Sequence, residues 1–420
     1  MTSEAAQHCY VYITLPGQTT PVTAGRYTLA NNRQGEAQGS FVYGRSYLGR
    51  ADAVPLDPVE LKLSNRSYIT QALGGVFGAL RDASPDYWGR RVIQRHTGHT
   101  QLSELAYLLH SPDDRAGALD FGLNPTPPAP RRLFNQTLEL TRLQAIADAI
   151  MADEVVPADA AHEQVDNLLL LGTSMGGARP KTVVEDENGL WIAKFNRPDD
   201  PWNSARVEHA MLVLARQCGL ATAESRVVGV GGRDVLLVKR FDREKTPNGY
   251  LRTRMVSALT VLRAQDTYPQ RANWSYVQLA EELRRACAQP AYNAAELFRR
   301  MTFNALISNT DDHPRNHALI AKAQDWKLSP AYDLTPSTPL SLERRDSAME
   351  CGDTGRYANA NNLLSQGARF LLERPVALAM VDQMEQQVRN QWHATARSAG
   401  VTEPDCEIIS TAFAYPGFRY

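Results

Sequence analysis

The sequence predicts an α+β fold with two lobes, the first rich in β-strands and the second mostly helical. Three observations support this. Short runs of β-branched and aromatic residues bounded by Gly or Pro recur through the first half. Helical spacing of apolar residues dominates from about residue 250, and P-T-P-P-A-P-R-R at 125–132 interrupts any regular element. We therefore expect an N-terminal subdomain, a first lobe and a helical second lobe, with bounds 1–125, 126–245 and 246–420.

The N-terminal segment begins with a strand-like run. Tyr10–Leu15 reads Y-V-Y-I-T-L and stops at Pro-Gly, and G-S-F-V-Y-G at 39–44 predicts a second strand. Helical spacing follows at 70–94 and 100–109, with Gly and Pro between the helices. The sequence predicts no chemistry for this segment, so a scaffold or docking surface is the expectation.

The first lobe should start with helices at 137–151 and 158–171, followed by a glycine-rich loop, G-T-S-M-G-G-A-R-P-K, at 172–181. The next two apolar runs, at 182–185 and 190–195, flank D-E-N-G and predict a hairpin. An amphipathic helix is expected at 202–218, where Val207, Ala210, Met211 and Leu214 share one face. A second hairpin should turn at Gly231-Gly232.

The composition excludes several classes of protein. Lys and Arg number 45 against 46 Asp and Glu, with a pI near 6.8, which gives no general electrostatic footprint for direct DNA binding. The five cysteines are far apart and form no C-x-x-C pair, so we expect a reducing compartment. The first residues do not resemble a signal peptide, and no apolar run could cross a bilayer. A soluble, cytoplasmic protein with no membrane partner is the expectation.

The glycine-rich loop is the first candidate for chemistry. Gly172, Gly176 and Gly177 would let backbone N–H groups approach an anion, although glycines mark ordinary turns more often. Lys194 stands on the second strand of the hairpin that follows, where a phosphate-binding lysine is expected, although most strand lysines are simply solvated. Glu208 on the next helix could orient this lysine or could be an exposed helix charge.

The second candidate is N-T-D-D-H-P-R-N-H at 309–317. Asp311 and Asn316 are five residues apart, the separation of the base and the metal-binding Asn in kinase catalytic loops. Asp333, in A-Y-D-L-T-P-S, could supply the further oxygen ligand that Mg²⁺ requires. Two alternatives stay open for this stretch. His313, His317 and Asp312 could bind zinc, although Pro314 disfavours a helix through them, or an Asp could simply cap a helix.

The motifs together resemble the HipA-type toxin kinases. The matching stretches, in order, are P-D-Y-W-G-R-R at 85–91, L-A-Y-L-L at 105–109, T-S-M-G-G-A-R-P-K, A-K-F, V-K-R-F-D-R, N-T-D-D-H-P-R-N-H, P-A-Y-D-L-T-P-S and S-A-M-E-C-G at 347–352. The resemblance covers about residues 25 to 395. It implies a bilobal kinase fold and ATP- and Mg²⁺-dependent phosphorylation of protein serine or threonine.

The resemblance also assigns roles to residues. Asp311 would be the catalytic base, with His313 beside it near phosphate, and Asn316 and Asp333 would hold magnesium. The expected contacts to ATP are Ser174, Gly176, Gly177, Lys181, Lys194, Val238, Lys239, Phe241 and His313. Ser174 would be an autophosphorylation site, where added charge should repel ATP and eject the loop. The Ser174 hydroxyl could equally form a hydrogen bond with the backbone of its own turn.

The sequence departs from the family pattern at two positions, and the resemblance also implies binding partners. Many relatives have Glu where Lys239 stands, and Asp312 is acidic where a small residue is also tolerated. The resemblance implies a helix-turn-helix antitoxin, contact with DNA only through that antitoxin, and a protein substrate such as an aminoacyl-tRNA synthetase. The alternatives are a kinase-fold enzyme for a small molecule, a corepressor subunit that binds an antitoxin on DNA, and a metal hydrolase.

Overall fold

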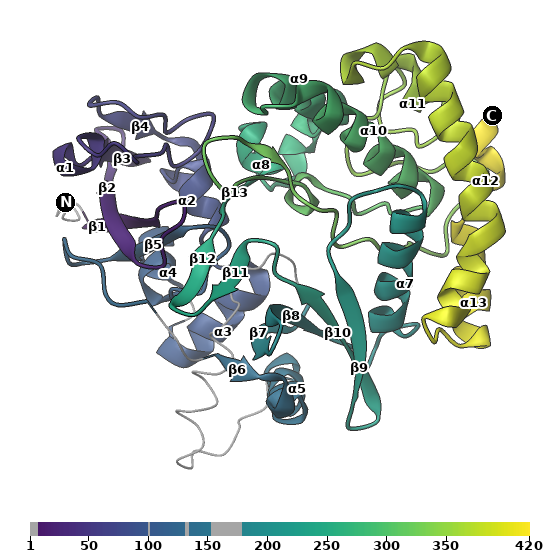
Figure 1. Ribbon diagram of the computed structural model, residues 1–420, viewed down its shortest axis with the longest axis horizontal. Helices are drawn as coiled ribbons and strands as arrows, with labels where there is room; N and C mark the ends of the chain where they lie inside the picture. Colours follow the sequence, from purple (N-terminus) through teal and green to yellow (C-terminus); the bar gives the residue numbers. More distant parts are fainter. Residues whose placement is uncertain (1–6, 100, 131–133, 153–178) are drawn as a thin grey trace. The chain divides into compact units, whose positions relative to one another are not determined.

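The computed structural model describes residues 7–99, 101–130, 134–152 and 179–420. The chain divides into two compact units. Unit 1 consists of residues up to 197 with 239–256 and 320–324, and unit 2 consists of 198–238, 257–319 and 325–420. Strands prevail in the N-terminal region and helices in the C-terminal region, which confirms the predicted α+β class (Figure 1). The expected boundaries at 125 and 245 remain predictions, and the helix expected at 158–171 lies outside the described residues.

The first sheet of unit 1 has five strands in the order β4-β3-β2-β1-β5, and its neighbouring strands run antiparallel. The bounds are β1 Gln7–Thr14, β2 Pro21–Asn31, β3 Ala37–Tyr43, β4 Tyr68–Thr70 and β5 Leu119–Gly122. Cys9, Val11 and Ile13 of β1 are completely buried, and Tyr12 and Thr14 are 1% exposed, so the second half of the strand is buried on both faces. Helix α4 packs on β1 and β5. Both strands predicted in this segment are confirmed.

The helices of this segment are short because the sequence repeatedly interrupts them. Their bounds are α1 Arg45–Leu48, η1 Ala72–Gly74, α2 Gly78–Asp82, α3 Tyr87–Thr97 and α4 Glu104–His110. The helical spacing predicted at 70–94 is therefore divided, and α3 begins only after Ser84-Pro85. Asp86 caps α3 by accepting a hydrogen bond of 2.7 Å from the backbone N–H of Gly89. Ser103 caps α4 through the N–H of Ala106.

A second group of strands in unit 1 contains the predicted hairpin. The bounds are β6 Asn135–Gln136, η2 Thr137–Glu139, α5 Leu140–Met151, β7 Lys181–Asp186 and β8 Gly189–Phe195. β6 runs parallel to β7, and β7 pairs antiparallel with β8 across a two-residue turn. Gly189 has φ of 119°, a conformation that favours glycine at this turn. The register places Lys181 opposite Lys194, so the predicted hairpin is confirmed.

Two further hairpins follow α7 Ser204–Gln217. β9 Ser225–Val230 pairs with β10 Arg233–Lys239, and both turn residues, Gly231 and Gly232, have positive φ, as type I′ turns require. This hairpin and α7 were predicted. The hairpin of β11 Arg243–Thr246 and β12 Gly249–Arg252 was not, although Asn248-Gly249 is a strong turn signal. Few apolar residues flank that signal, so the strand pattern is weak.

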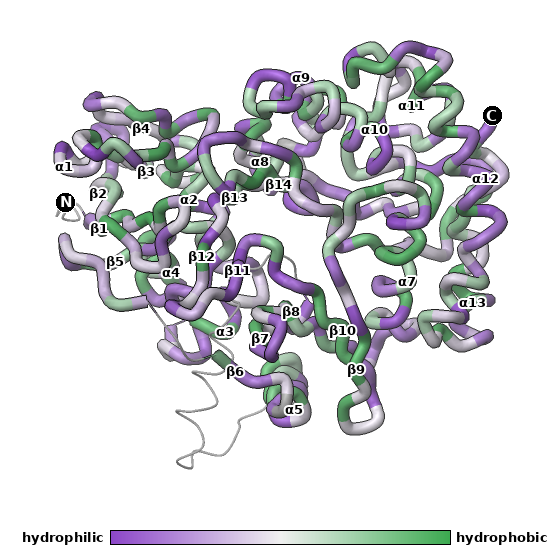
Figure 2. Tube along the Cα trace, in the orientation of Figure 1, coloured by the Kyte–Doolittle hydropathy of each residue, from purple (hydrophilic) through white to green (hydrophobic). Residues whose placement is uncertain are grey.

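Unit 2 is mainly helical, and α10 is its central helix. The bounds are α8 Ala258–Val261, η3 Tyr268–Asn273, α9 Tyr276–Ala286, α10 Pro290–Leu306, η4 Pro314–Asn316, α11 Ala360–Ser365, η5 Gly367–Phe370, α12 Arg374–Ser398, α13 Glu403–Ile409, η6 Ser410–Ala412 and η7 Pro416–Arg419. Nearly every residue of α10 after its first turn is buried, because α9 and α12 pack against it. Hydrophilic and apolar residues alternate along α12, which buries one face only (Figure 2).

Three short strands complete the fold: β13 Arg254–Ser257, β14 Ala318–Ala321 and β15 Lys327–Leu328. β14 follows the stretch at 309–317 directly, so that stretch connects α10 to a strand. In the described part of the chain, no helix combines the length and the apolar character needed to cross a bilayer.

Candidate active site

The stretch at 309–317 forms a loop that leaves the buried end of α10. Ile307 closes α10, and Ser308 turns the chain with φ of 55°. Pro314 starts the 3₁₀ turn η4, where the missing N–H of proline costs no hydrogen bond. The loop then enters β14 at Ala318, so both of its ends are fixed in buried structure.

Asp311 and Asn316 lie at opposite ends of this loop and are joined by a hydrogen bond. Asn316 Nδ2 donates to the backbone carbonyl of Asp311 at 3.2 Å. The Asp311 side chain is exposed, whereas Asn316 is 7% exposed. The loop thus presents the Asp311 carboxylate outward and holds the Asn316 amide inward. Because Nδ2 of Asn316 is bonded, its Oδ1 is the atom suited to a metal ion.

Asp333 belongs to a second loop that is tied to the first. The N–H of Ser337 donates to the carbonyl of Ser308 at 3.0 Å, and the Thr310 hydroxyl donates to the Ser337 hydroxyl at 2.8 Å. Asn309 Nδ2 lies 3.5 Å from the carbonyl oxygen of Asp333. Asp333 itself has φ of 60°, in the left-handed region that Asp tolerates better than most residues. Both loops therefore have a defined geometry relative to each other.

Asp311 and Asp333 are close enough for their charges to interact. Desolvation by the surrounding protein raises the pKa of the Asp311 carboxyl; the ring of His313 opposes this, and the negative charge of Asp333 raises the pKa further. A carboxylate whose charged form is disfavoured by a neighbouring carboxylate is common at functional sites. A hard divalent ion bound to oxygen ligands would relieve that repulsion.

His313 lies beside Asp311 against aromatic residues. Its ring is edge-on to Trp274, with 6.3 Å between the ring centroids, and Arg271 lies over the same Trp274 ring at 5.3 Å. His313 Nδ1 is buried and makes no hydrogen bond within the described structure. An unsatisfied ring nitrogen next to the carboxylate suits a group that meets a ligand.

Asp312 has a structural role that sequence reasoning missed. Its carboxylate is 1% exposed, and its Oδ2 accepts hydrogen bonds from three buried side chains: Tyr276, Asn304 at 2.7 Å and His317 Nε2 at 2.9 Å. It does not cap a helix, so that interpretation of Asp312 is wrong. Among the described residues, no group of three His, Cys, Asp or Glu could hold a metal ion, so the zinc alternative gains no support.

The predicted lysines of unit 1 differ in their environment. Lys181 is 2% exposed, and its Nζ donates to Asp86 Oδ2 at 2.7 Å, while its carbonyl accepts from Trp88 Nε1 at 3.0 Å. This accounts for Asp86 and Trp88 in the P-D-Y-W stretch, because both fix β7 against α3. Lys194, on the next strand, is half-buried. The contact of either lysine with phosphate remains a prediction.

The other predicted residues occupy well-defined positions. Val238 is buried at the end of β10, Phe241 is half-buried just after it, and Lys239 Nζ lies 5.7 Å from the centroid of the Trp191 ring. Their contact with adenine remains a prediction. Glu208 is 7% exposed, so the interpretation as an exposed helix charge is wrong. The loop residues Gly172, Ser174, Gly176 and Gly177 lie outside the described part of the chain.

The V-K-R-F-D-R stretch also contains a buried charge network that the sequence did not reveal. We call Asp114, Arg240, Asp242 and Arg243 the arginine cluster. Arg240 donates to Asp114 and, at 2.8–3.0 Å, to both oxygens of Asp242. Arg243 Nη1 donates to Asp242 at 2.8 Å, and the backbone N–H of Gly117 does so at 2.9 Å. The four side chains are at most 6% exposed.

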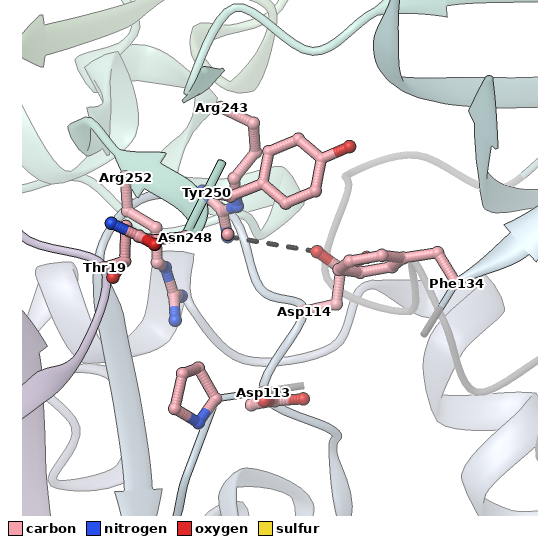
Figure 3. A pocket seen from close by; sticks show the side chains of 10 residues that line it. Thr19, Asp113, Asp114, Phe134, Arg243, Asn248, Tyr250 and Arg252 are labelled. Atoms are coloured by element: carbon pink, nitrogen blue, oxygen red, sulfur yellow. Dashed lines mark ion pairs between the residues drawn. The ribbon is translucent and has the colours of Figure 1, made fainter. Parts of the chain in front are cut away.

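Figure 3 shows a small pocket of unit 1 that Asp114 and Arg243 of the arginine cluster line. Arg243 points towards Asp114 at 3.9 Å across this pocket, and Tyr250 and Phe134 line the same pocket with their rings edge-on. Burial would raise the pKa of Asp242, but the guanidinium groups of Arg240 and Arg243 hold it well below its ordinary range. Because its carboxylates are matched by guanidinium groups, the cluster has the character of a structural ion network.

Comparison with known proteins identifies the family. The model of the HipA-like C-terminal domain matches residues 173–392, which is more than half of the chain, and the HipA N-terminal domain matches 23–122. The chain belongs to the HipA-like family. This confirms the resemblance drawn from the motifs. Taken together, the two matched ranges contain all the stretches on which the resemblance was based.

Individual relatives of this HipA-like chain are distant. It is 25% identical over 244 residues to "Putative kinase Y4dM" of Sinorhizobium fredii, and 26% identical over 188 residues to "Putative kinase" of Haemophilus influenzae. The first match covers 54% of this chain and 58% of its relative, and the second covers 40% of this chain and 54% of its relative. The chain therefore spans less than two thirds of the length of either relative.

A solved structure shares the fold over almost the whole chain. It is that of HipA, in a complex with HipB and operator DNA from the toxin–antitoxin system of Shewanella oneidensis MR-1. The TM-score is 0.67 at 15% identity, and the match covers 96% of this chain and 94% of the other. At that identity the likeness establishes the fold alone.

Proposed function

We propose that this HipA-like chain is an ATP- and Mg²⁺-dependent kinase that phosphorylates serine or threonine in a protein. The observation that supports this most is the pair of linked loops in unit 2. They combine an exposed Asp311, an inward-facing Asn316 and Asp333, and the charge of Asp333 raises the pKa of Asp311. An acceptor-orienting carboxylate beside two oxygen ligands is the arrangement that phosphoryl transfer requires.

The donor set fits magnesium. Asp333 offers a carboxylate and Asn316 an amide oxygen, both of them hard ligands of the kind that Mg²⁺ accepts alongside phosphate oxygens. The thiol and imidazole groups that favour zinc do not gather here, since His317 Nε2 is bonded to Asp312 and Cys351 is a buried thiol whose pKa burial raises to about 12. Bound Mg²⁺–ATP would supply the phosphoryl group and neutralise its developing charge.

The residues of the site would then have separate roles in the reaction. Asp311 would accept the proton of the incoming hydroxyl and orient it, which its exposure permits and its raised pKa favours. Asn316 and Asp333 would hold the metal ion, and His313 would contact phosphate through its unsatisfied Nδ1. Lys194 and the glycine-rich loop are the residues proposed to contact the phosphates of ATP.

We further propose that the kinase is the toxin of a toxin–antitoxin pair, restrained by a helix-turn-helix protein. The support is family membership together with the HipA neighbour, which was solved with HipB and operator DNA. A component of translation, such as an aminoacyl-tRNA synthetase, is the substrate class that the resemblance implies. Autophosphorylation at Ser174 belongs to the same proposal.

Labelling with [γ-³²P]ATP tests the activity. Wild-type protein with Mg²⁺ should label itself or proteins of a cell lysate, and EDTA should abolish the labelling. Ser174→Ala should remove the self-labelling and leave labelling of lysate proteins. A folded protein that labels nothing under these conditions would rule out the proposed activity.

A corepressor role is the second candidate, and the same HipA neighbour favours it because that complex includes DNA. A chain with this role would bind the antitoxin and increase the affinity of the antitoxin for operator DNA, whether or not the chain transfers phosphate. Gel-shift titrations of antitoxin and DNA, with wild-type protein and with Asp311→Asn, would separate this role from catalysis. If both proteins increase the affinity of the antitoxin for DNA equally, and wild type labels nothing, corepression would be the primary function.

A further inference from the structure

Asp311 and Asp312 are neighbours in the chain whose side chains face opposite ways. Asp311 is exposed, whereas Asp312 is 1% exposed. A buried carboxylate is costly unless hydrogen bonds compensate for its lost hydration. The donors that meet Asp312 come from three separate elements: Tyr276 starts α9, Asn304 is in the last turn of α10, and His317 ends the loop.

The surroundings of Asp312 are buried and closely packed. Tyr276, Asn304 and His317 are each 0–1% exposed, and the Tyr276 and His317 rings are edge-on with 5.6 Å between centroids. The backbone carbonyl of His317 accepts from the N–H of Ala258 at 2.8 Å, which holds the ring in place. The His317 tautomer that carries its hydrogen on Nε2 can donate to Asp312 Oδ2, which lies 2.9 Å away.

A second set of bonds continues from Asn304 to both functional loops. Asn304 Oδ1 accepts from Asn309 Nδ2 at 3.0 Å, and the same amide nitrogen lies 3.5 Å from the carbonyl of Asp333. Asn309 Oδ1 accepts from the backbone N–H of Asp311 at 3.3 Å. The Asp312 carboxylate is therefore connected, through two buried amides, to the backbone of each carboxylate proposed to act in the reaction.

We propose that Asp312 is a positioning residue that sets the geometry between Asp311 and Asp333 by ordering this network before any ligand binds. The inference rests on the proposed kinase function for its kinetic consequence, but its structural content does not. Without the carboxylate, three buried donors lose their common acceptor, and each unsatisfied group costs free energy. The loop would then sample other conformations in which Asp311 is misplaced, and misplacement is costly for catalysis.

Amide hydrogen exchange of the protein without nucleotide provides the first test. Asp312→Ala should speed exchange in residues 309–317 and near Asp333, and leave α12 at the wild-type rate. Glu385→Gln is the matched control, because Glu385 is a 6% exposed carboxylate of α12 bonded to Arg389 and Arg419. That control should speed exchange near α12 and leave both loops unchanged. Wild-type exchange of both loops in Asp312→Ala would overturn the proposal.

Kinetics provide the second test. Asp312→Ala should lower kcat by about 10–100-fold, as loss of a supporting partner of a catalytic group commonly does, while the Kd for ATP changes by less than about threefold. A residue that merely stabilises the fold would lower the melting temperature and leave kcat of the folded enzyme unchanged, as expected of Glu385→Gln. An Asp312→Ala enzyme with wild-type kcat below its melting temperature would contradict the inference.

A milder variant covers the case in which Asp312→Ala does not fold. Tyr276→Phe removes one donor and keeps the ring, so it should reproduce the exchange pattern and lower kcat by about three- to tenfold. Wild-type exchange and wild-type kcat in that variant would overturn the proposal. If wild-type protein transfers no phosphate, the kinase proposal fails, and the exchange experiment alone still decides whether Asp312 orders the loops.

Discussion

Two groups of acidic residues in this molecule lie in opposite electrostatic environments. In the arginine cluster of unit 1, Arg240 and Arg243 surround Asp242, burial is nearly complete, and the pKa of Asp242 is held well below its ordinary value. At the linked loops of unit 2, Asp311 is exposed, and its pKa is raised, in part by the charge of Asp333.

The difference shows what each group contributes. Pairing of charges makes the folded state more stable when both partners are already desolvated, and removal of one partner leaves the other buried and unpaired. Repulsion between carboxylates lowers stability, and a protein retains it where a ligand supplies the missing cation. Substitutions in the arginine cluster should therefore change stability but not chemistry, and substitutions at the linked loops should do the reverse.

The largest effect is expected for Asp311→Asn. The amide cannot accept the proton of the attacking hydroxyl, so kcat should fall by about 10²–10⁴-fold. Because the substitution also removes repulsion with Asp333, the melting temperature should stay the same or rise. Steady-state phosphorylation and differential scanning calorimetry measure the two quantities. A variant that is both inactive and clearly less stable would break the contrast between the two groups.

Arg240→Met should have the largest effect on stability. It leaves Asp114 and Asp242 buried without their shared guanidinium, which should cost about 3–5 kcal/mol of unfolding free energy. The free energy is measured by urea denaturation, and kcat is measured under conditions where the variant is folded. A loss below about 1 kcal/mol, or a loss of kcat in the folded variant, would show that the cluster is not purely structural.

Acid should weaken the arginine cluster in a defined direction. The pKa of Asp242 is lower in the folded than in the unfolded chain, so the unfolded chain binds a proton first as the pH falls. The stabilisation is complete near neutral pH and should decline as the pH drops below about 5, by about 1 kcal/mol down to about pH 3. Asp242→Asn should be less stable at pH 7 and lack this decline.

That comparison with Asp242→Asn is needed because other buried carboxyls act with the opposite sign. Burial raises the pKa of Asp57 and Asp120, so their protonation favours the folded chain as the pH falls. Urea denaturation of both proteins between pH 3 and pH 7 isolates the contribution of Asp242. Parallel curves for the two proteins would contradict the assignment.

The smallest effect is expected for Lys239→Glu. Its ammonium lies 5.7 Å from the Trp191 ring, and such a contact contributes about 0.5–1 kcal/mol. We expect the KM for ATP to change by less than about fivefold. Lys239→Gln, which removes the charge without reversing it, is the control. A larger change in KM with Glu than with Gln would place this side chain near the nucleotide.

Sequence reasoning predicted the elements whose signals are local. The hairpin at Lys181–Phe195, α7 and the turn at Gly231-Gly232 all follow from periodicity and turn residues. The spacing of Asp311 and Asn316 also lies within one short loop, and it identified that loop without knowledge of the fold. The need for a further oxygen ligand for Mg²⁺ led to Asp333, which lies 22 residues beyond Asp311 in the chain.

The missed features depend on contacts between distant parts of the chain. Asp312 meets Tyr276 across 36 residues, and Arg240 meets Asp114 across 126 residues. A single sequence shows which residues carry charge but not which charges become buried together. One local signal was available and not used: Asn248-Gly249 predicts the turn of the β11–β12 hairpin.

The left-handed backbone of Asp333 restricts what can replace it. Glycine and asparagine adopt a φ of 60° at little cost, but neither carries a carboxylate, and glutamate carries one without the same tolerance for this backbone. The backbone conformation and the proposed role as a metal ligand therefore impose separate demands on this position, and aspartate alone meets both. A lineage that lost catalysis while keeping its architecture would be expected to drift to Asn or Gly at this position.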